Sequence, residues 1–257
     1  MNFDFNEEQT MIMDGIARYI REEYDFDRRR SIIESDSAYS DDVWRQFSEL
    51  GWLSIPFDES YGGFGGHADD LAGVMLELGK GLIIEPYMST VVVFGSLLNA
   101  SNNDSLKEQL IPRIINGQYK GSFAYAEEQS RFEISDVKTS AQKCGDGYKL
   151  NGTKIAVIDA KESDGLIVTA RTGGSQYGAE GISLFLVDTS AEGVAVSSYN
   201  TMDSHSSSTI NLENVFVTEA NLIVHEGEGF RHIESCLPQI LLCLSAEALG
   251  IMEVLNK

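Results

Sequence analysis

The sequence has few cysteines, few prolines and little positive charge. Its three cysteines, Cys144, Cys236 and Cys243, are far apart, which excludes CxxC metal spacing and a disulfide framework and predicts reduced thiols. The four histidines lack zinc-site spacing, so we expect no metal. Lysine and arginine number 19 against 40 acidic residues, a net charge of −21. This balance repels phosphate backbones, so nucleic acid and anionic membranes are not expected partners.

Long uninterrupted apolar runs are also absent. The longest, near Thr90–Leu98 and Ile240–Leu244, are too short to cross a bilayer. The N-terminus, MNFDFNEEQ, has neither the basic nor the apolar segment of a secretory signal. We therefore expect a soluble, cytoplasmic protein.

The first part of the chain has the pattern of helices. Asn6 and Gln9 form a capping-box sequence, and Ile12 and Ile16 begin an apolar stripe at helical spacing. Three further helices are expected, at about Ser40–Leu50 (ending at Gly51, with Trp44, Phe47 and Leu50 inward), His67–Lys80 and Met88–Asn99. A fifth is expected over Asp104–Asn116, with Asp104 as its cap. The pattern predicts an all-α domain over residues 1–118.

Between Gly121 and Glu219 the pattern changes to short β-rich runs separated by turns. The segment Cys144–Gly147 has the composition of a tight hairpin turn. Many strands without intervening helices favour an antiparallel β-barrel or sandwich over a parallel α/β sheet. The prediction is an α+β fold whose middle β domain covers residues 119–230.

Residues 231–257 return to a helical pattern, with Pro238 interrupting the helix or starting its main part. This segment is apolar over more of its circumference than a surface helix tolerates. We expect that another chain covers it or that the natural protein continues beyond Lys257. It is interpreted as the start of a truncated C-terminal helical domain.

Three short motifs have alternative interpretations. The glycine cluster Tyr61–Gly66 lacks the strand and Lys-Ser/Thr of a phosphate loop, so a helix-to-helix turn is favoured. Asp203–Ser206 contains Ser-His-Ser but no GxSxG elbow accompanies it, which argues against a hydrolase triad. Glu247 lies among apolar residues, where a raised pKa would suit a base; a helix-face Glu pointing to solvent or a partner Arg is favoured.

A collinear series of segments resembles the acyl-CoA dehydrogenase family. The series includes IPFDESYGGFGG (residues 55–66), LKEQLIPRIINGQYKGSFAYAE (106–127) and KTSAQKCGDGYKLNGTK (138–154), and the resemblance covers essentially all 257 residues. ELGKGLIIEPYMSTVV and GTKIAVIDA look most like the branch that contains small subunits of pimeloyl-CoA and steroid-side-chain dehydrogenases, which work as heteromers.

The resemblance implies N-terminal helices, a central β-barrel and a C-terminal helical bundle. It also implies FAD between barrel and bundle, an acyl-CoA thioester as substrate, and α,β-dehydrogenation. A glutamate of the family takes the α-proton while the flavin accepts the β-hydride.

Mapping the family's flavin-binding pattern onto this chain exposes departures. Thr-Glu-Pro falls on Ala126-Glu127-Glu128, Gly-Ser-Asp on Arg131-Phe132-Glu133, and the Trp and Thr beside the flavin on Ala156 and Ile158. Three hydroxyls are thereby lost, each worth about 0.5–1.5 kcal/mol. The candidate FAD-binding residues are Tyr125, Ala126, Arg131, Phe132, Ala156, Val157 and Ile158. The backbone amides of Tyr125, Ala126 and Val157 can serve the flavin ring in place of the lost hydroxyls. Arg131 is either a partner for a phosphate or a surface arginine.

No catalytic residue is expected in this chain. The family's usual glutamate belongs to helices beyond this sequence, and an alternative early position falls near Ile240, which cannot be a base. The first hypothesis is therefore a flavin-dependent acyl-CoA dehydrogenase subunit that lacks the base. The second is a non-catalytic partner of a heteromeric acyl-CoA dehydrogenase with a degenerate flavin site. A general acyl-CoA-binding module is the third, and a homo- or hetero-oligomer is expected in either of the first two.

Overall fold

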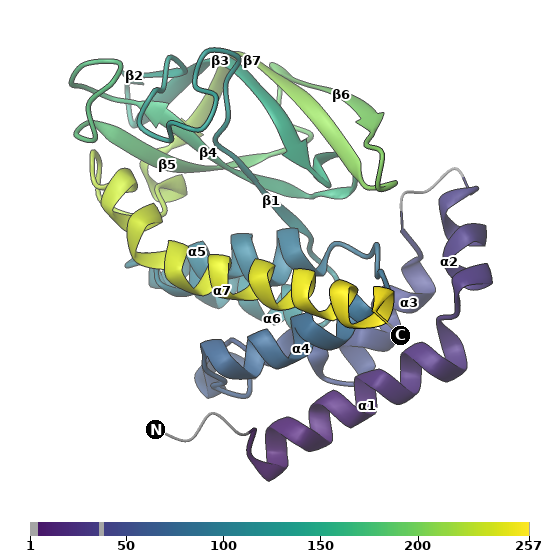
Figure 1. Ribbon diagram of the computed structural model, residues 1–257. Helices are drawn as coiled ribbons and strands as arrows, with labels where there is room; N and C mark the ends of the chain where they lie inside the picture. Colours follow the sequence, from purple (N-terminus) through teal and green to yellow (C-terminus); the bar gives the residue numbers. More distant parts are fainter. Residues whose placement is uncertain (1–4, 36–38, 257) are drawn as a thin grey trace.

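The computed structural model describes residues 5–35 and 39–256. A layer of helices supports a curled β-sheet, and β1 runs from the helical layer into the sheet (Figure 1). The helices are α1 (Glu7–Glu23), α2 (Phe26–Ile33), α3 (Asp41–Glu49), α4 (Ala68–Lys80), the π-helix η3 (Met88–Phe94), α5 (Gly95–Asn99), α6 (Asp104–Ile115) and α7 (Gly229–Leu255). Short 3₁₀ turns are η1 (Trp52–Ser54), η2 (Glu59–Tyr61), η4 (Ala160–Glu162) and η5 (Glu219–Asn221).

Local signals set most helix starts. The Asn6–Gln9 capping box is present at α1, as predicted. The cap of α6 is Asn103, one residue before the predicted Asp104. Leu50 was predicted to point inward but is 53% exposed, because it caps the end of α3 rather than belonging to its buried face. Helix α2 had no counterpart in the prediction, since its short polar sequence has a weak apolar stripe.

Within the described residues, seven strands form one mixed sheet in the order β1-β4-β2-β3-β7-β6, with β5 paired to β4. They are β1 (Gly121–Ala124), β2 (Ser140–Cys144), β3 (Gly147–Ile158), β4 (Gly165–Arg171), β5 (Ile182–Asp188), β6 (Val194–Asn200) and β7 (Ser206–Thr218). The α+β fold is confirmed. The sheet is not purely antiparallel, because β1 pairs in parallel with β4 and β2 meets β4 in parallel at one position.

The predicted hairpin at Cys144–Gly147 is confirmed. Cys144 pairs with Gly147 across the antiparallel β2–β3 turn, and Gly145 has a φ of +63°. The glycine cluster at Tyr61–Gly66 is also a turn, between η2 and α4; a Cβ on Gly63 would lie 1.9 Å from the Phe57 carbonyl oxygen. The division into domains at residues 118 and 230 stays a prediction.

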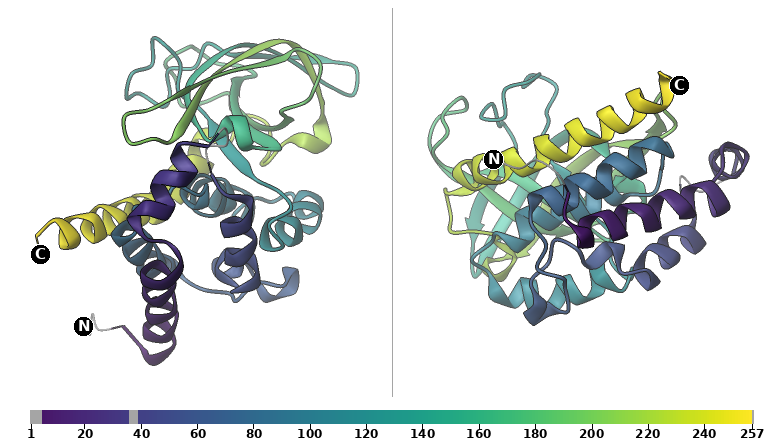
Figure 2. Two further views of the ribbon diagram at one scale, coloured as in Figure 1. Left: turned by 90° about the vertical axis from the view of Figure 1, so that its right-hand side faces the viewer. Right: turned by 60° about the horizontal axis from the view of Figure 1, so that its bottom comes forward.

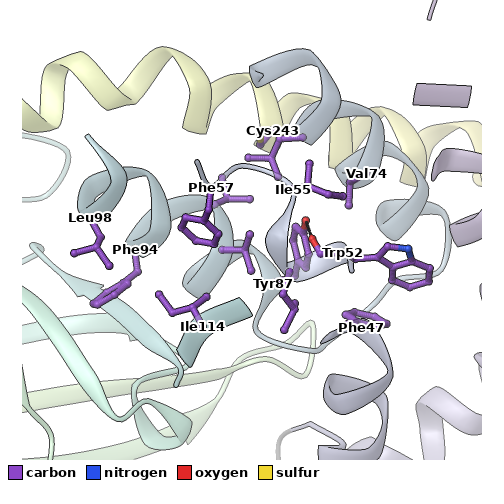
Figure 3. Close-up of a cluster of buried hydrophobic side chains, with 14 of the residues drawn as sticks. Phe47, Trp52, Ile55, Phe57, Val74, Tyr87, Phe94, Leu98, Ile114 and Cys243 are labelled. Carbon is purple, nitrogen blue, oxygen red and sulfur yellow. Dashed lines mark hydrogen bonds between the residues drawn. The ribbon is translucent and has the colours of Figure 1, made fainter. Parts of the chain in front are cut away.

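Two clusters of buried apolar side chains hold these layers together. One fills the helical layer and includes Phe47, Tyr87 and Phe94, with Cys243 of α7 pointing into it (Figure 3). The other lies inside the curled sheet around Tyr148 and Phe185. Cys236 and Cys243 are buried free thiols in the first cluster, while Cys144 is exposed.

Helix α7 is continuous from Gly229 to Leu255, so Pro238 neither breaks nor starts it. It runs beside α4, and α4 beside α1 (Figure 2). Helices α4 and α7 approach each other closely at two glycines. A Cβ on Gly79 of α4 would lie 2.3 Å from the Glu247 carbonyl oxygen, and a Cβ on Gly250 of α7 would lie 2.0 Å from the Leu76 carbonyl oxygen. Close backbone approach of this kind requires residues without a side chain.

The outer face of α7 remains apolar and exposed, at Leu242, Leu249, Met252 and Leu255. Among the described residues α7 alone is long and apolar enough to cross a membrane, a property that the core helices of soluble proteins share. The apolar length of α7 is not visible as one run in the sequence, because Pro238, Ser245 and Gly250 interrupt the run of apolar residues but not the helix.

Candidate functional site: two adjoining cavities along α7

Two cavities lie side by side between the helical layer, the sheet and α7. The first, which we call the apolar cavity, has a volume of about 360 Å³. Its walls come from η3 (Met88, Val93), from the ends of β1 and β3, and from α7 (Leu237, Ile240, Leu244). Among its described lining residues none is a carboxylate, and the polar side chains are those of Ser89 and Tyr125.

The predicted flavin-facing residues divide into three groups. Tyr125, Ala156 and Ile158 line the apolar cavity together. Ala126 lies beside them, because its carbonyl oxygen accepts a hydrogen bond of 2.9 Å from the Ile155 amide. The side chain of Val157 points the other way, into the core of the sheet, so only its backbone remains for a ligand.

Arg131 and Phe132 do not line this cavity. They lie in the turn that follows Glu127, where Arg131 has a positive φ of 49° and the side chain of Phe132 is completely exposed. Arg131 is therefore not among the described residues that line the apolar cavity.

A buried ion pair supports the segments that carry Tyr125 and Ala156. Lys154 is fully buried, and its Nζ lies 2.7 Å from Glu127 Oε1 and 2.7 Å from Thr169 Oγ1. The backbone amides of Lys138 and Thr139 also donate to the Glu127 carboxylate, at 2.8 and 3.0 Å. Burial raises the pKa of this carboxyl, but Lys154 and the hydrogen bonds outweigh burial and hold it below its usual value.

The sequence analysis did not predict that Lys154 is buried, although the strand pattern around it indicates this. Tyr148, Leu150 and Lys154 follow the period of two that places side chains on the inner face of a strand, and all three are buried. A lysine at an inward position requires a buried counter-charge. Its partner Glu127 is 27 residues away in the sequence.

The second space has a volume of about 340 Å³ and a lining that is mostly apolar; we call it the polar cavity for the carboxyl groups that it also contains. It shares Met88, Ile158 and Leu244 with the apolar cavity. The two cavities therefore adjoin at these three residues. The far part of the polar cavity lies between α4, the segment 82–88, the loop 201–206 and the Glu247–Ile251 turn of α7.

Two buried carboxyl groups line the polar cavity. Glu85 is 3% exposed and Asp159 6% exposed. Burial raises the pKa of each to about 7, against opposing hydrogen bonds from Tyr24 to Glu85 and from Ser89 to Asp159. Ser89 Oγ donates to Asp159 Oδ2 at 2.6 Å. Glu85 Oε1 accepts a bond of 3.3 Å from the Ser40 amide, but Oε2 has no hydrogen-bond partner among the described residues.

Glu247 lines the polar cavity and not the apolar one. Its side chain is partly buried, and burial raises the pKa of its carboxyl. Part of its surface stays exposed, and no arginine forms an ion pair with it among the described residues, so whether it faces solvent or a partner arginine stays a prediction. The described residues contain no group of three or more potential metal ligands.

A helical layer and a curled sheet that enclose an apolar cavity beside two strand ends define an α+β protein with a candidate binding site. Residues 6–118 match the model of the acyl-CoA dehydrogenase N-terminal domain, and residues 122–215 match that of the middle domain. The chain belongs to the acyl-CoA dehydrogenase family.

Two curated relatives are similar over nearly the whole chain. It is 29% identical to a probable acyl-CoA dehydrogenase, YngJ, of Bacillus subtilis, covering 98% of this chain and 67% of YngJ. It is 28% identical to mitochondrial isovaleryl-CoA dehydrogenase of Pongo abelii, covering 96% of this chain and 60% of that protein. The chain thus spans about two thirds or less of the length of these relatives.

The solved ChsE4–ChsE5 complex from Mycobacterium tuberculosis contains a chain of the same fold. The TM-score is 0.87 at 23% identity, over 99% of this chain and 67% of that one. This likeness concerns the fold.

The described residues fit the ring of a flavin better than its phosphates. Tyr125 and Ile158 expose large apolar surfaces, 39% and 54%, where they line the apolar cavity. A ring can pack on these surfaces and meet backbone groups of residues 125–126 and 156–158. The side chains of Ala126, Ala156 and Ile158 offer no hydrogen bond, so a flavin ring bound here would meet apolar surface, backbone groups and the hydroxyls of Tyr125 and Ser89.

Proposed function

We propose that this chain is a subunit of a flavin-dependent acyl-CoA dehydrogenase. The observation that carries the proposal is the apolar cavity, where Tyr125, Ala156 and Ile158 from two strand ends meet Leu237 and Ile240 of α7. The family and its named relatives support a CoA thioester as the substrate class. Bound FAD would supply the hydride acceptor.

The roles of this chain's residues follow from their positions. Tyr125 and Ile158 form a wall for the flavin ring, and Met88 and Leu244 line the path of the acyl group. The Lys154–Glu127 pair holds the strand ends that carry this wall, so these two are positioning residues. Water is excluded by the apolar lining, which strengthens the polar interactions that remain.

We propose that the catalytic base comes from residues outside the apolar cavity, because the described residues that line this cavity include no carboxylate. Removal of an α-proton requires a base within hydrogen-bond reach of it. A partner subunit or further residues of the full protein would supply it. Assembly with another acyl-CoA dehydrogenase subunit, as a homo- or hetero-oligomer in the cytoplasm, is part of the proposal.

Flavin binding tests the proposal directly. Titration of the purified protein with FAD, followed by quenching of flavin fluorescence, should give saturable binding, and an excess of an acyl-CoA should perturb the flavin absorption spectrum. Ile240→Trp should fill the apolar cavity and abolish the perturbation, whereas the exposed Leu255→Trp on the same helix should not. A folded protein that binds neither FAD nor acyl-CoA contradicts the proposal.

The second candidate is a non-catalytic partner subunit. It is favoured by the side chains at Ala126, Ala156 and Ile158, which offer the flavin no hydroxyl. Co-expression with a second dehydrogenase subunit separates the two. Activity of a homo-oligomer of this protein excludes the non-catalytic role, whereas activity that requires the second subunit and survives Ile240→Trp here supports it.

A further inference from the structure

The polar cavity continues the apolar cavity along α7. Met88, Ile158 and Leu244 line both spaces, so a ligand that extends past these three side chains enters the polar cavity. From Leu244 to Ile251 the α7 wall of the polar cavity extends for about 10 Å at the helical rise per residue. With C–C bonds of about 1.5 Å, an extended alkyl chain advances by about 1.3 Å per carbon, so this wall accommodates about eight carbons.

The wall that such a chain would follow is apolar. Its side chains come from α4, from the segment before η3 and from α7, and they are Met75, Leu78, Ile83, Tyr87, Leu244 and Ile251. An alkyl chain that enters this space exchanges water for apolar contact, which favours binding in proportion to the apolar area that is buried.

Most polar side chains of this lining belong to the sheet side, at Asp159 and in the segment 201–206. Glu85 and Glu247 come from the helical layer, but Oε2 of Glu85 is inaccessible. Burial raises the pKa of Glu85 and Asp159 to about 7 and the pKa of Glu247 above its ordinary value. A protonated carboxyl is neutral, so below neutral pH these groups place little charge beside an alkyl chain.

One arginine bridges the two sides of the polar cavity. Arg29 of α2 donates from Nε to the Leu82 carbonyl oxygen, at 2.7 Å, and from Nη2 to the Asp203 carbonyl oxygen, at 3.1 Å. Helix α2 and the C-terminal end of α7 lie on the same side of the molecule (Figure 1), so Arg29 belongs to the end of the cavity away from the flavin wall. An alkyl chain that reached the guanidinium would remove water from its other N–H groups without replacing the lost hydrogen bonds.

We propose that the two cavities together bind a long acyl group, of about 12 carbons, and that Arg29 sets the upper limit of its length. About eight carbons lie along the wall from Leu244 to Ile251, and the stretch of the apolar cavity from Ile240 to Leu244, about 6 Å, holds about four more. This inference rests on the proposed function, because the CoA thioester must lie at the apolar cavity.

Calorimetry with acyl-CoAs of increasing length tests the proposal. Butyryl-, octanoyl-, lauroyl- and palmitoyl-CoA are titrated into the FAD-supplemented full chain, each below its micelle-forming concentration. The dissociation constant should fall at least about tenfold from butyryl- to octanoyl-CoA and again from octanoyl- to lauroyl-CoA, because each buried methylene favours binding. Palmitoyl-CoA should bind no more tightly than lauroyl-CoA.

Shortening the cavity should remove the long-chain preference. Ile251→Trp fills the far part of the polar cavity and should weaken binding of lauroyl-CoA at least about tenfold, while butyryl-CoA binds as before. Val254→Trp is the matched control, because Val254 is exposed on the same helix and lies outside the described lining of both cavities.

Opening the end of the cavity should have the opposite effect. Arg29→Ala should make palmitoyl-CoA bind at least about tenfold more tightly than it binds to the wild type, with octanoyl-CoA unchanged. Arg28→Ala is the control, because Arg28 is exposed on the same helix and outside the described lining. This variant changes a partly exposed side chain, so it tests the length limit even if Ile251→Trp does not fold.

The outcomes distinguish the two levels of the argument. Affinity that stops rising at octanoyl-CoA, or an unchanged length preference in both Ile251→Trp and Arg29→Ala, overturns the long-chain site and leaves the dehydrogenase proposal intact. Long-chain binding that survives Ile251→Trp would place the chain on the exposed outer face of α7, which also overturns this inference. A folded chain that binds none of the four compounds overturns the proposed function, and this inference with it.

Discussion

Two sets of buried charges in this molecule are treated in opposite ways. Inside the sheet, the carboxylate of Glu127 has Lys154 and two backbone amides as partners. In the polar cavity, Glu85 leaves one oxygen unpaired among the described residues, and Asp159 has the Ser89 hydroxyl instead of a cation. The first arrangement holds a structure together. In the second no cation contacts either carboxyl group among the described residues, and burial raises the pKa of both to about 7.

The largest effect should come from breaking the satisfied pair. Lys154→Met leaves Glu127 buried without its cation and should lower the free energy of unfolding by about 3–5 kcal/mol. Lys149→Met, at an exposed position of the same strand, is the control and should change it by less than about 0.5 kcal/mol. Urea denaturation followed by circular dichroism measures both. Equal losses in the two variants would mean that the ion pair contributes nothing specific.

The unsatisfied carboxyl should make stability depend on pH. The pKa of Glu85 is about 7 in the folded protein against an ordinary 4.5, so the folded state holds this proton more tightly than the unfolded state. Stability is therefore lost as pH rises from below 4.5 to about 7, by up to about 3 kcal/mol from this group.

The free energy of unfolding, measured at about pH 5 and about pH 8, tests this effect, because the two values lie below and above the pKa of Glu85 in the folded protein. Glu85→Gln should remove part of the decline, so that the difference between variant and wild type isolates Glu85 from Asp159 and Glu247. If Glu85→Gln loses as much stability between the two pH values as the wild type, Glu85 does not hold the proton responsible for the decline.

A smaller effect should follow from moving the α7 wall of the polar cavity without touching the sheet. A Cβ on Gly250 would lie 2.0 Å from the Leu76 carbonyl oxygen, so Gly250→Ala should separate α7 from α4 and cost about 1–3 kcal/mol. Gly15→Ala is the control, because no atom of the described residues lies within 4 Å of its Cβ, and it should stabilise helix α1 by about 0.5–1 kcal/mol. Thermal melting of both proteins checks the opposite signs.

The smallest effect concerns the boundary between the two cavities. Ile158→Thr would place a hydroxyl beside the proposed flavin wall and should strengthen FAD binding by about 0.5–1.5 kcal/mol, with little change in stability because the side chain is half exposed. Val196→Thr, on β6 and away from both cavities, should leave FAD binding unchanged. Fluorescence titration compares the dissociation constants. Unchanged affinity in Ile158→Thr would place the ring elsewhere.

Sequence patterns predicted the elements whose signals are local. The Asn6–Gln9 capping box and the Cys144–Gly147 hairpin each depend on residues within four positions of one another, and both are present. Leu50 and Pro238 were interpreted wrongly, because a helix end and a proline within a long helix are decided by the neighbouring packing. The flavin-facing segments were located from the resemblance, but sequence did not separate Tyr125 and Ile158 at the cavity from Arg131 and Phe132 outside it.

The sequence by itself determined the family, the α+β class and the apolar character of α7, because periodicity and turn composition are written in consecutive residues. Only the tertiary structure decided that Lys154 meets Glu127, that Asp159 meets Ser89, 70 positions away, and that burial raises the pKa of Glu85 to about 7. The physical reason is that burial and hydrogen-bond satisfaction depend on segments distant in the chain, which come together only when the helical layer packs against the sheet.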